Sequence, residues 1–400
     1  MARGKVSGYG GEPGPDGVRG SETNTPGLLA LSDWLTEQGR THVAMEATGV
    51  CWKPVRHILS DGDFTLILAN AAHVKNVPGR ETDVADATWL ADLLALGLIR
   101  PGFVPEEATR EMRALPRTRK QLVREQGSHI QRPQKTLEDA NIKLSSVLTN
   151  IAGVSGRDIL EALIGGETDP DQLLTLVRRG VKASPEKLRA SLQGHVTDRH
   201  RFLLRLHLRQ VDALDDAIAE IDAEVDRDLD PFRDAVRLSR IIPGVSDLTA
   251  QVIVSEIGTD MGRFPTAGHL ISWAGLCPRN DESAGKRRST RLREGAPWLK
   301  TTLVQCAWAA TRKKASYLHA QFQRLRQKRG PRKAICAVAA SILTAAHHMP
   351  RDGTSYSDLG PDQLRSDTRE AQARRLAQKI TRLGFSRQIA PAQQAEGVSV

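Results

Sequence analysis

At 400 residues the chain is too long for one compact core, so we expect two or three domains. Its formal charge of +10 favours an anionic partner, most often nucleic acid, and the aromatic content of 4% makes base-stacking platforms a secondary expectation. The four cysteines lack CxxC spacing, which argues against a zinc site or a disulfide scaffold and fits a reducing cytoplasm. No apolar run indicates a membrane span, and no N-terminal pattern indicates a signal peptide.

The first 26 residues are rich in glycine and proline and show no periodic pattern. This composition predicts an irregular arm over residues 1–26. From Leu28 onward, apolar residues recur at helix and strand spacing. The expected elements are a helix ending at Gly39, a strand at 41–49, a helix at 52–62, a strand at 64–70 and a helix at 82–97. Their alternation predicts an α/β domain over residues 27–150.

Residues 106–150 predict a basic helical segment, with the cations Arg110, Arg113, Arg117, Arg119, Lys120 and Arg124. Pro116 and Pro133 lie within this segment. A proline inside a helix costs roughly 3 kcal/mol, because it removes a hydrogen bond and clashes with the preceding turn. We therefore expect the helix to be kinked or broken at these two positions.

Residues 151–235 predict a helical region with a coiled-coil pattern. Alternating steps of three and four separate Leu204, His207, Val211, Leu214, Ile218, Ile221 and Val225. A coiled coil and a packed helical hairpin within one chain explain this spacing equally well. His207 is interpreted as a packing residue rather than a ligand.

Residues 236–350 predict a last, mainly helical domain. It opens with IPGVS, a tight turn after an apolar stretch, and Ser246 or Asp247 can cap the helix that follows. This helix-hairpin-helix-like turn presents backbone N–H groups that can hold a phosphate, although many structural turns share the pattern. Residues 297–350 predict helices, and 351–400 predict one helix at about 367–383 followed by a tail.

Three acidic residues in the α/β domain are candidate metal ligands. Glu46 lies near the end of an apolar strand, and Asp83 and Asp86 share one helix face. An exposed or paired glutamate, and an acid pair favoured by the helix dipole, explain these positions without any ligand. The functional interpretation is a set of carboxylates that bind Mg²⁺. Two such ions about 4 Å apart stabilise the attacking and the leaving oxygen in phosphoryl transfer.

The stretch DESAGKRRSTRLREGAPWLK, residues 281–300, combines serines with cations. Ser283 precedes the small residues Ala284 and Gly285, which allow a substrate to approach closely, whereas Ser289 is better interpreted as a phosphate contact. Residues 284–333 hold fifteen Lys and Arg and one acid, Glu294. The candidate nucleic-acid contacts are Lys286, Arg287, Arg288, Arg291, Arg293, Lys300, Lys313 and Lys314. Taken alone, a loop serine is seldom a nucleophile.

Five stretches in this order resemble one family. They are MEATGVCWKPV, ETDVADATWLADLLALGLIRPGFVP, IPGVSDLTAQVIVSEIG, WAGLCPRNDESAGKRRSTRLREGAPWLKTTLVQCAWAA and RGPRKAICAVAASIL. Together they resemble the DEDD transposases of insertion sequences, relatives of the pilin-gene invertases, over residues from about 28 to 385. The resemblance implies an RNase H-like (RuvC-like) N-terminal domain, a helical coiled-coil insertion and a mainly helical C-terminal transposase domain.

The resemblance also implies a chemistry. Glu46, Asp83 and Asp86 fall on the family's metal-binding acids, and Ser283 falls on its serine nucleophile, which is thought to form a phosphoserine link to DNA. Members act on double-stranded DNA with Mg²⁺, and many are directed by a structured guide RNA. A homo-oligomer is implied, in which the acids of one subunit lie beside the serine of another.

One departure stands out. The family opens with an apolar strand that carries its first catalytic aspartate, and no such strand is recognisable upstream of Leu28. Asp16 lies in the turn-like GPDG and is not assigned that role. Three metal ligands in place of four predict a defective site, in a copy that is decayed or truncated at its start.

Three functional hypotheses follow. The chain is a serine-using DNA recombinase, a RuvC-like metal-dependent nuclease for which Ser283 is dispensable, or a non-catalytic nucleic-acid-binding remnant of a transposase. A covalent protein–DNA adduct distinguishes the first from the others. Metal-dependent nicking that survives Ser283→Ala favours the second, and salt-sensitive binding without either activity favours the third.

Overall fold

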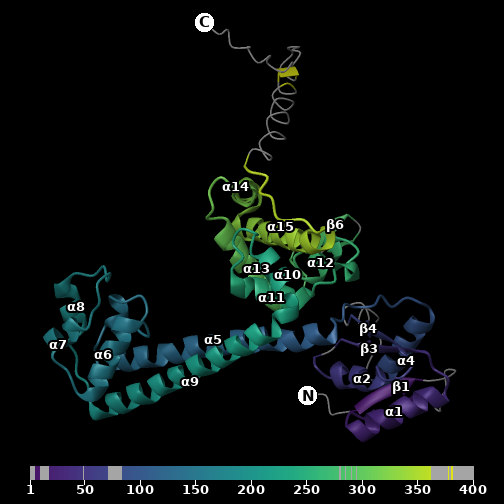
Figure 1. The fold of residues 1–400 in the computed structure, drawn as a ribbon, viewed down its shortest axis with the longest axis horizontal. Helices are drawn as coiled ribbons and strands as arrows, with labels where there is room; N and C mark the ends of the chain where they lie inside the picture. Colours follow the sequence, from purple (N-terminus) through teal and green to yellow (C-terminus); the bar gives the residue numbers. More distant parts are fainter. Residues whose placement is uncertain are drawn as a thin grey trace. The chain divides into compact units, whose positions relative to one another are not determined.

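The structure is a computed structural model that describes residues 5–9, 18–47, 49–70, 83–278, 281–283, 285–289, 291–293 and 295–361, together with 377, 380 and 381. It divides into two compact units, residues 1–105 and 106–400. Both are drawn in Figure 1. Asp16 and most of the helix expected at 367–383 lie outside the described residues.

The N-terminal unit contains strands and helices in alternation. Its elements are β1 (Lys5–Tyr9), β2 (Val18–Glu22), α1 (Thr25–Glu37), β3 (His42–Glu46), α2 (Trp52–Leu59), β4 (Thr65–Ala69) and α4 (Asp83–Ala95). β3 and β4 pair in parallel, with Glu46 opposite Ala69. The strands and helices expected from Leu28 onward are therefore confirmed.

Local sequence signals explain where α1 begins and ends. The Asn24 side chain accepts a hydrogen bond from the Gly27 N–H, and Gly39 has a φ of 62°, which glycine adopts readily. The apolar face of α1 packs against α2 in a buried core of Leu28, Leu31, Leu35, Val55 and Leu59. This core supports the layer from which β3 presents Glu46.

Residues 5–9 and 18–22 form strands where the composition predicts an irregular arm. β1 and β2 pair as an antiparallel ribbon in which Lys5 is opposite Glu22. No apolar strand is recognisable in this part of the sequence, but five-residue strands can pair without an apolar run. Neither of these strands contains an aspartate.

The C-terminal unit begins with two long helices that lie side by side, α5 (Glu107–Asp139) and α9 (Asp198–Asp228) (Figure 1). Between them, η2 (Leu144–Ser146), α6 (Val154–Gly165), α7 (Pro170–Thr175) and α8 (Pro185–Ser191) pack around a buried core that includes Leu137, Ile159, Leu163 and Leu204. The 196–229 pattern thus faces α5 of the same chain, with Val211 and Val225 buried. This is the helical hairpin within one chain.

Of the kink or break expected at Pro116 and Pro133, the break is contradicted, because α5 continues through both prolines. Both prolines are buried. Packing of their rings and of the surrounding turns offsets the hydrogen bond that each proline removes.

The remaining helices form a bundle around α15 (Pro331–Asp352). They are η3 (Asp230–Phe232), α10 (Arg233–Ser239), α11 (Asp247–Ile257), η4 (Met261–Arg263), α12 (Ala267–Trp273), α13 (Pro297–Ala310) and α14 (Tyr317–Arg329), and the hairpin strands β5 (Asp281–Ser283) and β6 (Lys286–Ser289) precede α13. α15 buries Ala334, Ile335, Val338, Ala339, Ile342, Leu343 and Ala346 against α12, α13 and α14. None of the described helices is both long enough and apolar enough to span a bilayer.

The turn at 240–246 confirms the predicted cap. The Ser246 side chain accepts a hydrogen bond from the Thr249 N–H, and the Thr249 hydroxyl in turn accepts one from the Ser246 N–H. Gly244 has a φ of 84°, and a Cβ there would lie 2.6 Å from the Ala310 nitrogen. A glycine is therefore required for the turn to lie against α13.

Candidate functional site

The three predicted acids belong to one compact unit. Glu46 is the last residue of β3, at the carboxyl end of the parallel β3–β4 pair, and its side chain is partly buried. α4 begins at Asp83 and contacts β3. Asp86 follows Asp83 by one turn of the same helix. The side chains of Asp83 and Asp86 lie outside the described residues.

The donor chemistry of this region fits a hard divalent cation. Carboxylate oxygens are the ligands that Mg²⁺ prefers, and two of the three acids occupy the first turn of a helix, where the dipole favours anionic groups. Among the described side chains, which exclude Asp83 and Asp86, no group of three metal-ligating residues is assembled.

Ser283 lies at the tip of a β-hairpin. It is the last residue of β5 and pairs with Lys286, the first residue of β6. The turn between them places Gly285 at a φ of 73°, which an L side chain rarely adopts. The sequence does not predict this hairpin. The side chains of Ser283, Arg287 and Arg288 lie outside the described residues.

The base of this hairpin is held by backbone contacts. The Arg293 N–H donates to the Cys277 carbonyl at 3.2 Å, and the Ala296 N–H donates to the Trp273 carbonyl at 3.3 Å. Gly275 and Gly295 approach so closely that a Cβ on Gly295 would lie 2.6 Å from the Gly275 Cα. The segments after α12 and before α13 are therefore fixed to each other directly below the hairpin.

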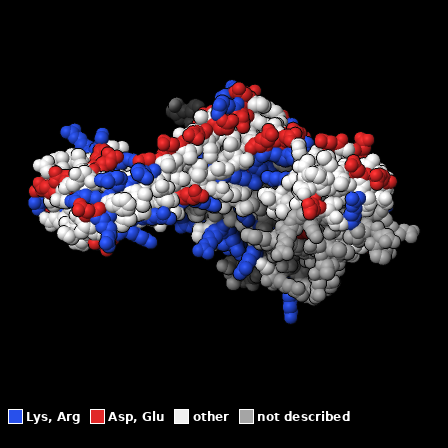
Figure 2. Space-filling model, turned by 90° about the horizontal axis from the view of Figure 1, so that it is seen from below, with Lys and Arg blue, Asp and Glu red and all other residues white. Residues whose placement is uncertain are grey.

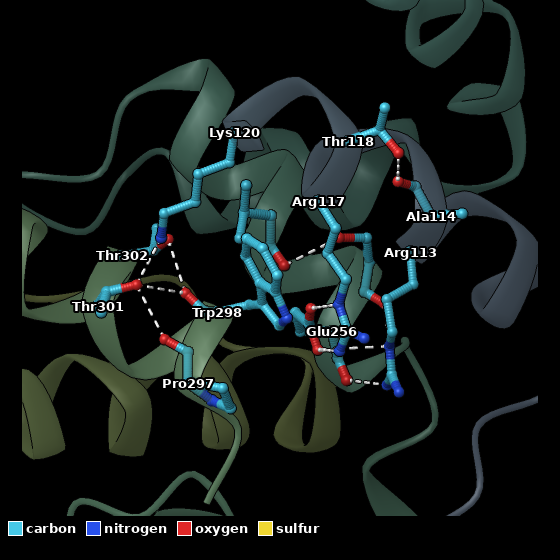
Figure 3. A network of polar contacts seen from close by, with 12 residues as sticks. Arg113, Ala114, Arg117, Thr118, Lys120, Glu256, Pro297, Trp298, Thr301 and Thr302 are labelled. Atoms are coloured by element: carbon cyan, nitrogen blue, oxygen red, sulfur yellow. Dashed lines mark hydrogen bonds and ion pairs between the residues drawn. The ribbon is translucent and has the colours of Figure 1, made fainter. Parts of the chain in front are cut away.

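A buried glutamate connects α5 to the helices that carry this base. Glu256, on α11, is 1% exposed and binds two arginines of α5 (Figure 3). Arg117 donates to both of its carboxylate oxygens, at 2.7 and 2.9 Å. The Arg113 Nε lies 3.3 Å from the same carboxylate and also donates to the Ser255 carbonyl. Such a bidentate pair fixes the geometry of both partners.

The same cations cover two tryptophans that flank the hairpin base. The Arg113 guanidinium lies 6.0 Å from the ring centroid of Trp273, the last residue of α12. Arg117, Lys120 and Arg124 lie 5.8, 5.7 and 5.7 Å from the ring of Trp298, the second residue of α13. These separations are within cation–π range.

Burial shifts the titration of two of these cations. It lowers the pKa of Arg113 to about 10, against the opposing attraction of Glu256. Burial, together with the neighbouring Arg124, also lowers the pKa of Lys120. The cluster therefore holds its positive charge at an electrostatic cost.

Sequence reasoning missed this cluster. It noted the cations of the 106–150 segment but gave them no partner, and it did not single out Glu256 or Trp298. The available signal was the spacing of Arg113, Arg117, Lys120 and Arg124, whose steps of four, three and four place them on one helix face.

The predicted nucleic-acid contacts have different surroundings. Lys286, Arg291, Arg293, Lys313 and Lys314 are exposed. Lys300 is half-buried and donates to the Arg293 carbonyl at 3.1 Å, which gives it a structural role at the hairpin base. On the face shown in Figure 2, Lys and Arg form several patches separated by acidic and uncharged surface.

Comparison with known proteins identifies two segments. The profile of a transposase family, DEDD_Tnp_IS110, matches residues 18–142. A second profile, described as Transposase IS116/IS110/IS902 family, matches residues 236–323.

A curated relative from Streptomyces coelicolor, titled "Insertion element IS110 uncharacterized 43.6 kDa protein", is 34% identical over 122 residues. The aligned segment covers 30% of this chain and 30% of that relative. Two segments of the chain, residues 18–142 and residues 236–323, are therefore similar to domains of the IS110-type insertion-sequence transposases.

Proposed function

We propose that the chain is a transposase that cleaves and rejoins double-stranded DNA. The observation that carries this proposal is the succession of two segments similar to transposase domains on one chain, the first containing Glu46, Asp83 and Asp86 and the second containing Ser283. The local structure is compatible with these roles. Glu46 ends β3, and Asp83 and Asp86 lie in the first turn of α4. Ser283 lies at a hairpin tip beside a turn of small residues.

In this proposal Ser283 is the nucleophile. Its Oγ attacks a DNA phosphorus, an Oγ–P bond forms, one P–O bond to deoxyribose breaks, and the leaving sugar oxygen takes a proton. One phosphodiester is replaced by another, so the link can be passed to a second DNA strand without an external energy source. Glu46, Asp83 and Asp86 would hold Mg²⁺, which when bound supplies charge stabilisation to the phosphoryl oxygens.

The exposed cations are assigned to the phosphate backbone. Lys286, Arg291 and Arg293 belong to the hairpin region, and Lys313 and Lys314 follow α13. Contacts of this kind position DNA but do not select a sequence. Target choice therefore has to come from elsewhere, and we assign it to a structured guide RNA held by a homo-oligomer. The low aromatic content is compatible with this division of labour.

The test is the capture of a covalent intermediate on a nicked DNA substrate that prevents rejoining. The wild-type chain is expected to give a DNA adduct that survives denaturation, and its formation should require Mg²⁺. Ser283→Ala should abolish the adduct, whereas Ser145→Ala, a change of the same type at an exposed serine of η2, should retain it. Adduct formation by Ser283→Ala would reject the assignment.

A second candidate function is binding without turnover. The described strands β1 and β2 contain no aspartate that could complete a set of four acids. A chain of this kind would bind nucleic acid with strong salt dependence and give neither adducts nor nicks. Nicking that depends on Mg²⁺ but survives Ser283→Ala would instead indicate a RuvC-like nuclease.

A further inference from the structure

The cation cluster between α5 and α13 carries more positive charge than the described acidic side chains neutralise. Arg113 and Arg117 contact one carboxylate, that of Glu256, whereas Lys120 and Arg124 lie beside the ring of Trp298. Glu256 is engaged by Arg113 and Arg117. Among the described residues, neither Lys120 nor Arg124 forms an ion pair with an acidic side chain.

Lys120 and Arg124 nevertheless both lie beside the same aromatic ring. Each lies 5.7 Å from the centroid of the same Trp298 ring. The Lys120 ammonium donates to the Thr301 hydroxyl at 2.5 Å, and that hydroxyl lies 2.9 Å from the Pro297 carbonyl in the first turn of α13 (Figure 3). The tryptophan and the threonine thus fix two like charges on one platform.

This arrangement favours an anion. The two cations beside this ring repel each other, and the partly buried position of Lys120 weakens screening by water. The platform lies at the positive, N-terminal end of the 14-residue helix α13, which adds to the attraction for negative charge. Arg124 and Thr301 are exposed, so the platform is accessible from solvent.

We infer that Lys120 and Arg124, supported by Trp298, bind a backbone phosphate of a nucleic acid. The inference extends the proposed function, on which it rests, to a site on α5 and α13. A single phosphate accepts hydrogen bonds from both cations and neutralises the charge that Glu256 leaves uncompensated. Ala296 belongs to the hairpin base, and Trp298 follows it by two residues. A nucleic-acid strand bound here therefore passes next to the hairpin that carries Ser283.

The test compares two variants of equal charge. Lys120→Gln/Arg124→Gln removes the platform cations, and Arg205→Gln/Arg209→Gln removes two exposed cations of α9. Affinity for a short duplex DNA and for a hairpin RNA is measured over a series of salt concentrations. Inorganic phosphate at the same ionic strength serves as the competitor that distinguishes a free anion from a backbone phosphate.

For at least one of the two nucleic acids, the platform variant should reduce the magnitude of the slope of log affinity against log salt by about 1, since one phosphate contact contributes about 0.9 on duplex DNA. The α9 variant should leave the slope within error of wild type. In thermal melts without nucleic acid, the platform variant should be as stable as wild type or more stable, because a repulsion has been removed.

Three results would overturn the inference. One is an unchanged slope on both nucleic acids. The second is that only inorganic phosphate, and neither nucleic acid, binds wild type more tightly than the platform variant, which would make the platform a site for a free anion. The third is a lowered melting temperature of the platform variant with unchanged binding, which would make the cluster a structural latch. Wild type that binds neither nucleic acid would reject the proposed function as well, whereas wild-type binding with an unaffected platform variant rejects the inference alone.

Discussion

Replacement of Glu256 by glutamine tests the electrostatic anchor between α5 and α11. The substitution keeps the shape of the side chain and removes its charge, which leaves the guanidiniums of Arg113 and Arg117 facing a neutral amide. Glu256 is 2% exposed at its side chain, and the two arginines are 15% and 33% exposed. The carboxylate is thus fully buried and its partners only partly so.

Removing one partner of a buried ion pair costs about 3–5 kcal/mol. The lower end applies here, because Arg117 retains access to water and Arg113 keeps hydrogen bonds to the Ser255 and Glu256 carbonyls. We therefore expect a loss of about 3 kcal/mol. At roughly 2–4 °C per kcal/mol for a domain of this size, the melting temperature should fall by about 6–12 °C.

Thermal unfolding followed by circular dichroism measures this change. Asp222→Asn is the matched control, since its pair with Arg119 has side chains that are 42% and 22% exposed and should contribute less than about 1 kcal/mol. Glu256→Gln/Arg117→Gln should recover part of the loss, because it removes an unneutralised guanidinium. A Glu256→Gln variant as stable as Asp222→Asn would refute the reasoning.

Two further predictions concern the hairpin base and the thiols. Gly295→Ala should destabilise the C-terminal unit by about 1–3 kcal/mol in urea unfolding, because its Cβ would meet the backbone of Gly275. The control Gly127→Ala lies in open space on α5 and should stabilise the unit by up to about 1 kcal/mol. Equal effects of the two substitutions would contradict the close approach of Gly275 and Gly295. Cys306 should resist a thiol reagent until the chain unfolds, since it is 1% exposed and burial raises the pKa of its thiol. The exposed Cys51 should react at once. Rapid modification of Cys306, located by peptide mapping, would contradict the described packing of α13.

Much of the fold could be predicted from local patterns. Periodicity and caps located α1, β3, α2, β4 and the start of α11, because these elements bury one regular face or begin at a capping side chain. The β1–β2 ribbon could not be predicted, because neither of its five-residue strands has an apolar run. The uninterrupted α5 could not be predicted either, because it packs against helices distant in the sequence. Pro116 and Pro133 show this most clearly, since their local cost is outweighed by burial that only the folded chain reveals.

The candidate site was predicted in part. Glu46 was expected at a strand end and is found there, and Ser283 was expected in a loop but ends a strand. The link from Glu256 through the arginines of α5 to the tryptophans was not predicted. More than a hundred residues separate the arginines of α5 from Glu256 and the tryptophans, and a buried glutamate carries no local signature.

The central claim is that the Ser283 hydroxyl becomes covalently joined to DNA. The most direct measurement is mass spectrometry of the protein–DNA adduct after digestion of both components. A nucleotide mass on the peptide that contains Ser283, fragmenting at that residue, is the predicted result. A nucleotide attached to any other residue, or cleaved DNA without a protein-linked nucleotide, would contradict it.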